Sequence, residues 1–188
     1  MRFLSIGLVA AVCLLAACDD EPPCHLEPKG QCAKSKFIDS KLAGMRLDHI
    51  DFTEATLSHV DLHKSDLTAA AFTGAQMVQA NLTEAQLEGA KLDKVVANGA
   101  SFRGAKLSGA SFEGATLDGA DFSAAALNGV SFRNAKIHGA DFRNTSFDKV
   151  DFTGAELGTS VVQGSRWTDV TCPDGKPVPA GAEHCPMK

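Results

Sequence analysis

Residues 100–124 read ASFRG-AKLSG-ASFEG-ATLDG-ADFSA, a five-residue period that continues on both sides without an insertion. Every Phe after Phe3, every Leu beyond position 30 and the single Trp, Trp167, occupy one phase of this period. A period of five fits neither the turn of an α-helix nor the two-residue alternation of a β-strand. The sequence therefore predicts a fold of stacked, repeating coils.

Each pentapeptide can be numbered from its large apolar residue, here called position 0. From Phe37 to Trp167 there are 27 successive positions of this kind. Position −2 is Ala, Ser or Thr in 21 of the 27 units, and 12 of the 13 Gly residues between 35 and 169 occupy position +2. Positions 0 and −2 point to the same side of an extended chain, where close packing demands a small partner for a large residue. Gly at position +2 indicates a turn with a positive φ angle.

This pattern resembles the A-(D/N)-L-x-x motif of the pentapeptide-repeat family, over residues 35–169. Clear matches are Ala80-Asn81-Leu82, Ala120-Asp121-Phe122 and Ala140-Asp141-Phe142. The resemblance implies an all-β fold, a right-handed quadrilateral β-helix with four pentapeptides per coil. The 27 units then make about 6.75 coils, in a rod roughly 32 Å long at about 4.8 Å per coil.

Four units per coil would make residues 20 apart neighbours in adjacent coils. Two internal Phe stacks on opposite faces follow, Phe102, Phe122 and Phe142 in one and Phe112, Phe132 and Phe152 in the other, the second continuing the column of Phe52 and Phe72. One unit reverses the sizes, with Val95 at position −2 and Ala97 at position 0. Compensated packing is one interpretation, and a local bulge that exposes Val96 is the other.

The N-terminus predicts export. In residues 1–18, MRFLSIGLVAAVCLLAAC, Arg2 precedes a 15-residue apolar run, which is typical of a secretory signal and shorter than the roughly 20 residues that span a bilayer. Its end, Leu15 to Cys18, resembles the bacterial lipobox, which implies cleavage before Cys18 and lipidation of Cys18 with fatty acids such as palmitate. Several acyl chains anchor stably where a single chain does not. The alternative is a plain signal peptide with an incidental Cys.

The resemblance to lipoproteins also implies a location. Asp19 and Asp20 resemble the signal that retains a lipoprotein on the periplasmic side of the inner membrane, which favours the inner over the outer membrane. All seven Pro residues lie outside the repeat, because Pro has no N–H for pairing between coils. The predicted division is a signal peptide (1–17), a lipidated tether and N-terminal cap (18–34), the β-helix (35–169) and a C-terminal cap (170–188). The 16 residues 19–34, if flexible, would reach about 20–25 Å.

Four cysteines flank the repeat, Cys24 and Cys32 before it and Cys172 and Cys185 after it. In an oxidising compartment, disulfides within each pair are expected to close the two ends, each contributing about 3 kcal/mol. His25 and His184 stand beside these cysteines and leave a metal site at each end as the alternative, although the spacing is not that of a zinc finger.

Motifs that carry chemistry are missing from the sequence. His59 and His63 are interpreted as solvated surface residues and not as a metal pair. There is no phosphate-binding loop, no H-E-x-x-H and no spacing that marks a nucleophile and its base. We therefore expect neither catalysis nor a cofactor.

The charge pattern bears on the partner. The chain after cleavage would carry 17 Lys and Arg against 23 Asp and Glu, a net charge of −6. One outward column, from Asp48 to Asp148, is mildly acidic, and another, from His63 to Arg143, is basic, so no continuous negative stripe is predicted. The expectation is a non-catalytic, membrane-tethered periplasmic scaffold or protein-binding rod with an envelope protein or glycan as partner, and no nucleic acid. The alternatives are a DNA-mimicking inhibitor or protector of type II topoisomerase and a purely structural envelope spacer.

Overall fold

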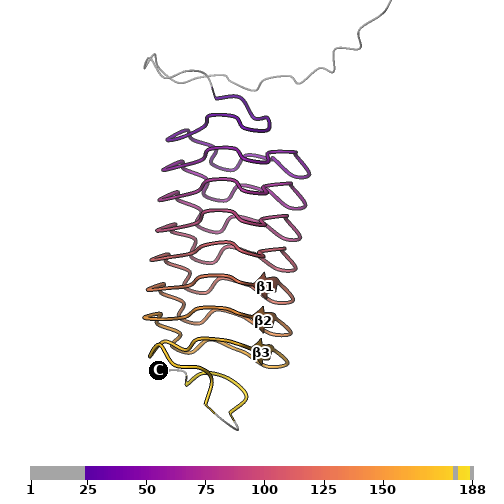
Figure 1. The fold of residues 1–188 in the computed structure, drawn as a ribbon. Coiled ribbons are helices and arrows are strands. Elements are labelled where there is room, and N and C mark those ends of the chain that lie inside the picture. Colours follow the sequence, from indigo (N-terminus) through magenta and orange to yellow (C-terminus); the bar gives the residue numbers. More distant parts are fainter. Residues whose placement is uncertain (1–23, 180–181, 187–188) are drawn as a thin grey trace, which may run out of the picture.

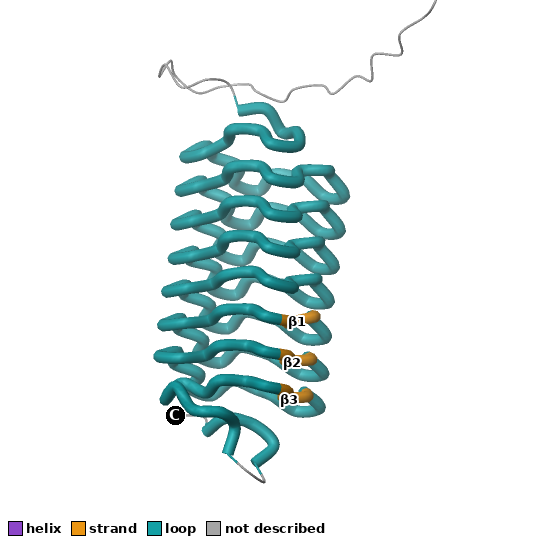
Figure 2. Tube along the Cα trace, in the orientation of Figure 1, coloured by secondary structure: helices purple, strands orange, loops and turns teal. Residues whose placement is uncertain are grey.

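The computed structural model describes residues 24–179 and 182–186. These residues form a stack of similar coils, with the N-terminal segment at one end and the C-terminal segment at the other (Figure 1). Three short strands, β1 (Ala126–Asn128), β2 (Ser146–Asp148) and β3 (Arg166–Thr168), form a parallel sheet in the order β1-β2-β3. The rest of the described chain is turns and isolated bridges (Figure 2), with no helix that could cross a membrane.

The coils are joined by parallel pairing between residues 20 apart. Bridges run in this register from Gln31↔Asp51 to Asp151↔Thr171, and the strands keep it, with Leu127 opposite Phe147 and Phe147 opposite Trp167. Each coil therefore takes four pentapeptides, as predicted, and the chain forms a β-helix. Pairing begins at Gln31, inside the segment where a tether and N-terminal cap were predicted.

We name the four faces by their position 0 residues. Face 1 carries Phe52, Phe72, Leu92, Phe112, Phe132 and Phe152; face 2 carries Phe37, Leu57, Met77, Ala97, Leu117, Ile137 and Leu157; face 3 carries Leu42, Leu62, Leu82, Phe102, Phe122, Phe142 and Val162; face 4 carries Leu47, Leu67, Leu87, Leu107, Leu127, Phe147 and Trp167. Most of these side chains are fully buried, together with the small residues at position −2. The core is thus a single apolar column that runs the length of the rod.

The two Phe stacks lie on opposite faces. The ring of Phe122 is 4.8 Å from that of Phe102 and 5.1 Å from that of Phe142, nearly parallel to both. Across the core it meets Phe112 and Phe132 edge to face, at 5.7 and 5.6 Å. Parallel contact along a face and edge contact between faces are both favourable aromatic geometries, so the four-sided section brings each ring into favourable contact with its neighbours.

Position +2 adopts a positive φ in every unit of the rod except 155–159, where Gly158 at position +1 has it instead. Gly occupies it in many units, as expected, but 16 residues other than Gly also have positive φ, and all of them lie at this position, from Lys29 to Asp169. An L-residue in this region is strained by roughly 1–2 kcal/mol. The turn is therefore imposed by the pairing of the coils, and Gly relieves strain without being required.

Backbone pairing leaves one N–H per unit unused, at position +1. In unit 80–84, for example, Leu82 N donates to Ser101 O, Glu84 N to Arg103 O and Asn81 N to Val60 O, and none of these bonds involves Thr83 N. The side chain of Asn81 accepts that remaining bond, at 3.1 Å. The same bond to position −1 recurs with Asp51, Asp61, Asp66, Asp121, Asp141 and Asp151. This explains the Asp or Asn of the motif.

The reversed unit keeps the regular path. Val95 and Ala97 are both fully buried, and Val96 bridges Gln76 on one side and Thr116 on the other. The larger residue at position −2 fills the space that the smaller one at position 0 leaves. The structure supports compensated packing and shows no bulge.

Both ends are closed by disulfides, as expected, between Cys24 and Cys32 and between Cys172 and Cys185. At the C-terminal end the chain folds back, so that Val178 N donates to Val170 O and Cys172 N to Lys176 O. The His184 ring lies 6.3 Å from that of Trp167. Because all four thiols are oxidised, none is available as a metal ligand.

Candidate interaction surface

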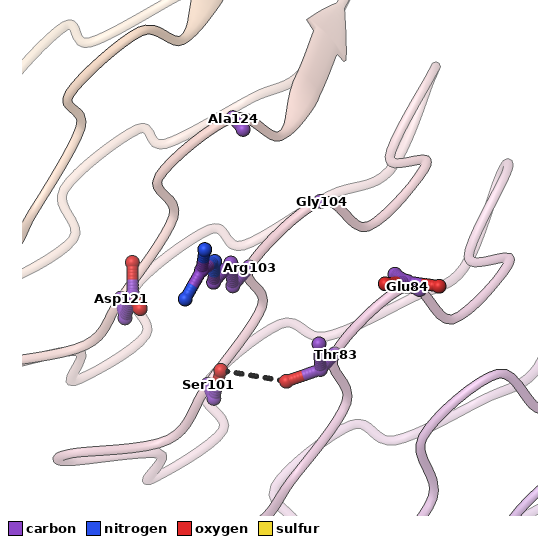
Figure 3. Close-up of a pocket in the computed structure, with 7 residues that line it drawn as sticks. All are labelled: Thr83, Glu84, Ser101, Arg103, Gly104, Asp121 and Ala124. Carbon is purple, nitrogen blue, oxygen red and sulfur yellow. Dashed lines mark hydrogen bonds between the residues drawn. The ribbon is translucent and has the colours of Figure 1, made fainter.

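A shallow hollow on face 3 is lined by Thr83, Glu84, Ser101, Arg103, Gly104, Asp121 and Ala124 (Figure 3). It arises because the corner residues are small at Gly104 and Ala124. The hydroxyls of Thr83 and Ser101 hydrogen-bond to each other at 3.0 Å, and neither is hydrogen-bonded to the carboxylate of Glu84 or Asp121. The hollow therefore lacks the parts of a catalytic site.

The two histidines considered as a metal pair lie on different faces. His63 pairs with Asp61 at 2.8 Å on face 3, whereas His59 on face 2 contacts Asp39 at 3.6 Å and Gln79 at 3.0 Å. Within the part of the chain that the structure describes, no three His, Cys, Asp or Glu residues gather as a metal site would require. Their position agrees with the interpretation as surface residues.

Several outward carboxylates are tied into the turns. Burial by itself would raise the pKa of Asp61, but hydrogen bonds from His63 and Asn81 outweigh it and lower that pKa below its ordinary value. Hydrogen bonds from the Arg143 side chain lower the pKa of Asp141 against partial burial. For Asp151 burial is again outweighed, by Thr153 and Arg133, and the pKa is lowered. Each of these three carboxylates accepts the backbone N–H two residues later, so its role is to stabilise the turn.

Charge is spread over faces 1, 3 and 4 with both signs mixed. Face 3, for example, carries Lys41, Lys64, Arg103 and Arg143 against Asp61, Glu84, Asp121 and Asp141. Acidic and basic residues on this face meet directly, as in the Arg143–Asp141 pair. No face presents the continuous negative stripe that imitation of DNA would need.

Face 2 differs, because three successive coils carry no Asp, Glu, Lys or Arg on it. We call this region the uncharged patch; its outward residues are Thr56, Ser58, His59, Gln76, Val78, Gln79, Val96, Asn98, Gly99 and Thr116. Lys36 and Asp39 border it toward the N-terminus, and Asp118, Lys136 and Glu156 toward the C-terminus. His138 bridges two of these, at 3.0 Å to Asp118 and 3.4 Å to Glu156.

The patch presents polar groups together with two valines, Val78 and Val96. Gln76 and Gln79 are exposed, and Val78 and Val96 are half-buried. The sequence analysis considered two outward columns, the one from Asp48 on face 4 and the one from His63 on face 3. Neither lies on face 2, so the uncharged patch was not predicted. The signal was available, because Thr56, Gln76, Val96 and Thr116 follow one another at a spacing of 20 residues.

Family sequence models of this repeat together match most of the rod. Sequence models of pentapeptide repeats match residues 31–68, 61–96 and 82–126, and a model of a pentapeptide repeat region matches residues 105–175. No curated protein shows significant sequence similarity to this chain.

Among solved structures, a pentapeptide repeat protein from the Arabidopsis thaliana thylakoid lumen is 34% identical, over 64% of this chain and 70% of its own, with a TM-score of 0.46. Rfr23 from the cyanobacterium Cyanothece 51142 is 22% identical, over 74% and 89%, with a TM-score of 0.48. QnrB1, a plasmid-mediated fluoroquinolone resistance protein, is 19% identical, over 80% and 83%, with a TM-score of 0.46. The bridges at 20-residue spacing and the matched repeats together identify the chain as a member of the pentapeptide-repeat family.

Proposed function

We propose that this protein is a non-catalytic, lipid-anchored rod on the periplasmic side of a bacterial membrane, and that it binds a protein partner through the uncharged patch of face 2. The anchor is inferred from the sequence Leu15-Ala16-Ala17-Cys18. The binding face is inferred from the patch, which is the observation that carries the proposal.

Protein interfaces have a characteristic composition that supports this choice of face. Their buried centres are depleted of charged residues and surrounded by a polar rim. The uncharged patch has this arrangement, with amides, hydroxyls and two valines at the centre and Lys36, Asp39, Asp118 and Glu156 at the border. A sugar chain is the less suitable partner, since the patch offers no Phe, Tyr or Trp ring on which a sugar could stack.

Site-specific crosslinking in cells tests the binding face. A photoreactive side chain at Gln76, in the patch, is compared with one at Ala126, an exposed residue at the same position of the unit on face 4. We expect a discrete crosslinked product from position 76 and none from position 126. Equal products from both positions, or none from either, would contradict the choice of face, and the second result would favour a structural spacer.

The identity of the crosslinked product separates the proposal from the DNA mimic. Recovery of an envelope protein supports the scaffold, whereas recovery of a type II topoisomerase would replace it with the alternative. The mixed charge of faces 1, 3 and 4 is the reason that we rank mimicry second.

Lipidation has its own test. The wild-type protein is expected to take up radiolabelled palmitate and to fractionate with membranes, while Cys18→Ser is expected to lose the label. A wild-type protein that stays unlabelled in the cytosol would refute the anchor and leave the fold untouched.

A further inference from the structure

The first coil of the rod has a different surface from the rest. Lys29, Lys34, Lys36 and Lys41 are all exposed, and none forms an ion pair with another described residue. Between residues 24 and 41 these four positive charges face only two negative ones, Glu27 and Asp39, which makes this segment +2 in a chain whose net charge is −5. We call the four lysines and Ile38 the end plate.

The same coil carries an exposed apolar side chain, since Ile38 shares face 2 with Lys36, and Lys34 and Lys41 lie on the two adjoining faces. Ile38 is 53% exposed, the largest value among the exposed large hydrophobic residues of the described chain. Its neighbour Phe37 is only partly buried, although the other Phe residues of the repeat are fully buried. Basic residues around an exposed apolar one are the combination that binds the interface of an anionic membrane.

The disulfide fixes how far this surface can be from Cys18. Cys24 is joined to Cys32, which is buried in the first coil, so only the five residues 19–23 lie between Cys18 and the folded chain. The six Cα–Cα steps from Cys18 to Cys24 span at most about 20 Å when fully extended. Residues 24–34 therefore belong to the folded end of the rod and cannot act as a flexible tether, which leaves only residues 19–23 for that role. An anchor at Cys18 would keep the N-terminal end of the rod beside the membrane.

We propose that the end plate binds the surface of anionic phospholipids, with the four lysines at the headgroups and Ile38 in the interface. The nearness of the membrane rests on the proposed function, but the affinity belongs to the folded rod and needs no lipid anchor. Asp19, Asp20 and Glu21 lie in the tether and oppose the attraction. Binding would orient the rod, holding its far end away from the bilayer and the uncharged patch free for a partner.

Vesicle binding of the unlipidated protein tests this inference separately from the anchor. The protein is the chain from residue 18 with Cys18→Ser, which retains every core residue because the core lies within residues 24–185. We expect it to sediment with vesicles of phosphatidylglycerol and phosphatidylethanolamine, to be released by salt, and to stay in solution with phosphatidylcholine. Each lysine near such a surface contributes about fivefold to binding.

Two variants of equal charge decide which lysines act. Replacing Lys29, Lys34, Lys36 and Lys41 with Gln is expected to weaken binding by at least about tenfold. Replacing four exposed lysines farther along the rod, Lys91, Lys94, Lys106 and Lys136, with Gln is the matched control and is expected to change binding by no more than about twofold. Ile38→Ser should weaken binding with the charge unchanged, and neutralising Asp19, Asp20 and Glu21 should strengthen it.

The inference is overturned if phosphatidylcholine binds the protein equally well, if no vesicle binds it, or if the control variant loses as much affinity as the end-plate variant. Failure of the anchor is seen in a different measurement, the palmitate label at Cys18. If the protein carries no palmitate label but still binds anionic vesicles, lipidation of Cys18 is refuted and membrane binding by the end plate is retained.

Discussion

The Asp or Asn at position −1 is outward-facing and yet structural. Its side chain accepts the one backbone N–H of the unit that pairing between coils leaves free, as Asp61 does for His63 at 3.2 Å. In three units whose position −1 lacks this side chain, a residue of the preceding coil substitutes for it. Asp93 accepts from Glu113 N, and Asn98 accepts from Asp118 N, both at 3.1 Å. Two sequence patterns thus satisfy the same N–H.

Asp61→Ala tests this role. The change removes the acceptor for His63 N, His63 Nδ1 and Asn81 Nδ2 together. We expect a loss of about 1–3 kcal/mol in the free energy of unfolding, because a partly buried donor is left unpaired. Urea denaturation measures it, with Asp61→Asn, which keeps an acceptor oxygen, as the conservative variant. If Asn cost as much as Ala, the charge and not the hydrogen bond would be responsible.

Gly158 is the one Gly of the repeat outside position +2, and it has φ +48°. A Cβ atom there would lie 2.5 Å from His138 Cδ2, whereas a Cβ at Gly109, also at positive φ, would meet nothing within 4 Å. Both Ala variants share the backbone strain, so their difference measures the clash. We expect Gly158→Ala to be the more destabilising in thermal unfolding, and the difference to shrink when His138 is also Ala. A difference that persists without His138 would disprove the steric explanation.

At the scale of the elements, stability resides in the internal stacks. Phe122 lies between Phe102 and Phe142 on its own face and meets Phe112 and Phe132 across the core. Phe37, by contrast, makes one edge contact, with Phe52 at 5.5 Å, and is only partly buried. The value of a Phe therefore depends on its place along the rod, although every Phe occupies the same position of the repeat.

Phe122→Leu and Phe37→Leu apply the same substitution at the centre of the rod and at its end, so the difference in stability between them measures the effect of place. We expect the first to cost about 1–3 kcal/mol, since the Leu leaves part of the space empty and forfeits the aromatic contacts, and the second to cost less than about 1 kcal/mol. Denaturant unfolding monitored by Trp167 fluorescence is the measurement. Equal losses at the two sites would show that the stack adds nothing beyond ordinary burial.

For the molecule as a whole, the lowered pKa values of Asp61, Asp141 and Asp151 predict how stability responds to acid. Each carboxyl binds its proton more weakly in the folded state than in the unfolded one, whose pKa is about 3.9. Their stabilisation is therefore fully present above that value and is lost as the pH falls through the folded values.

The free energy of unfolding is expected to change little between about pH 7 and 5 through these groups and to fall below about pH 4. Asp141→Asn combined with Asp151→Asn should flatten the acid limb. Arg143→Gln should reduce the contribution of Asp141 to the acid-induced loss of stability, because it removes the guanidinium that lowers the pKa of Asp141 and keeps the carboxyl itself. An unchanged acid limb in these variants would show that other groups govern acid unfolding.

The period of five determined the fold class, the inward residues and the Phe stacks of this protein, because burial requires the same alternation of large and small residues in every unit. The cysteine positions likewise predicted the two closed ends. The same period places outward residues 20 apart beside one another, so the neighbours in the uncharged patch could have been found from the sequence. The tertiary structure alone decided that residues 24–34 belong to the folded end of the rod, where the Cys24–Cys32 disulfide joins them to the first coil. It also revealed the bond between position −1 and the N–H of position +1. These features depend on the stacking of coils and on the path of the turn, which no single unit of the sequence contains.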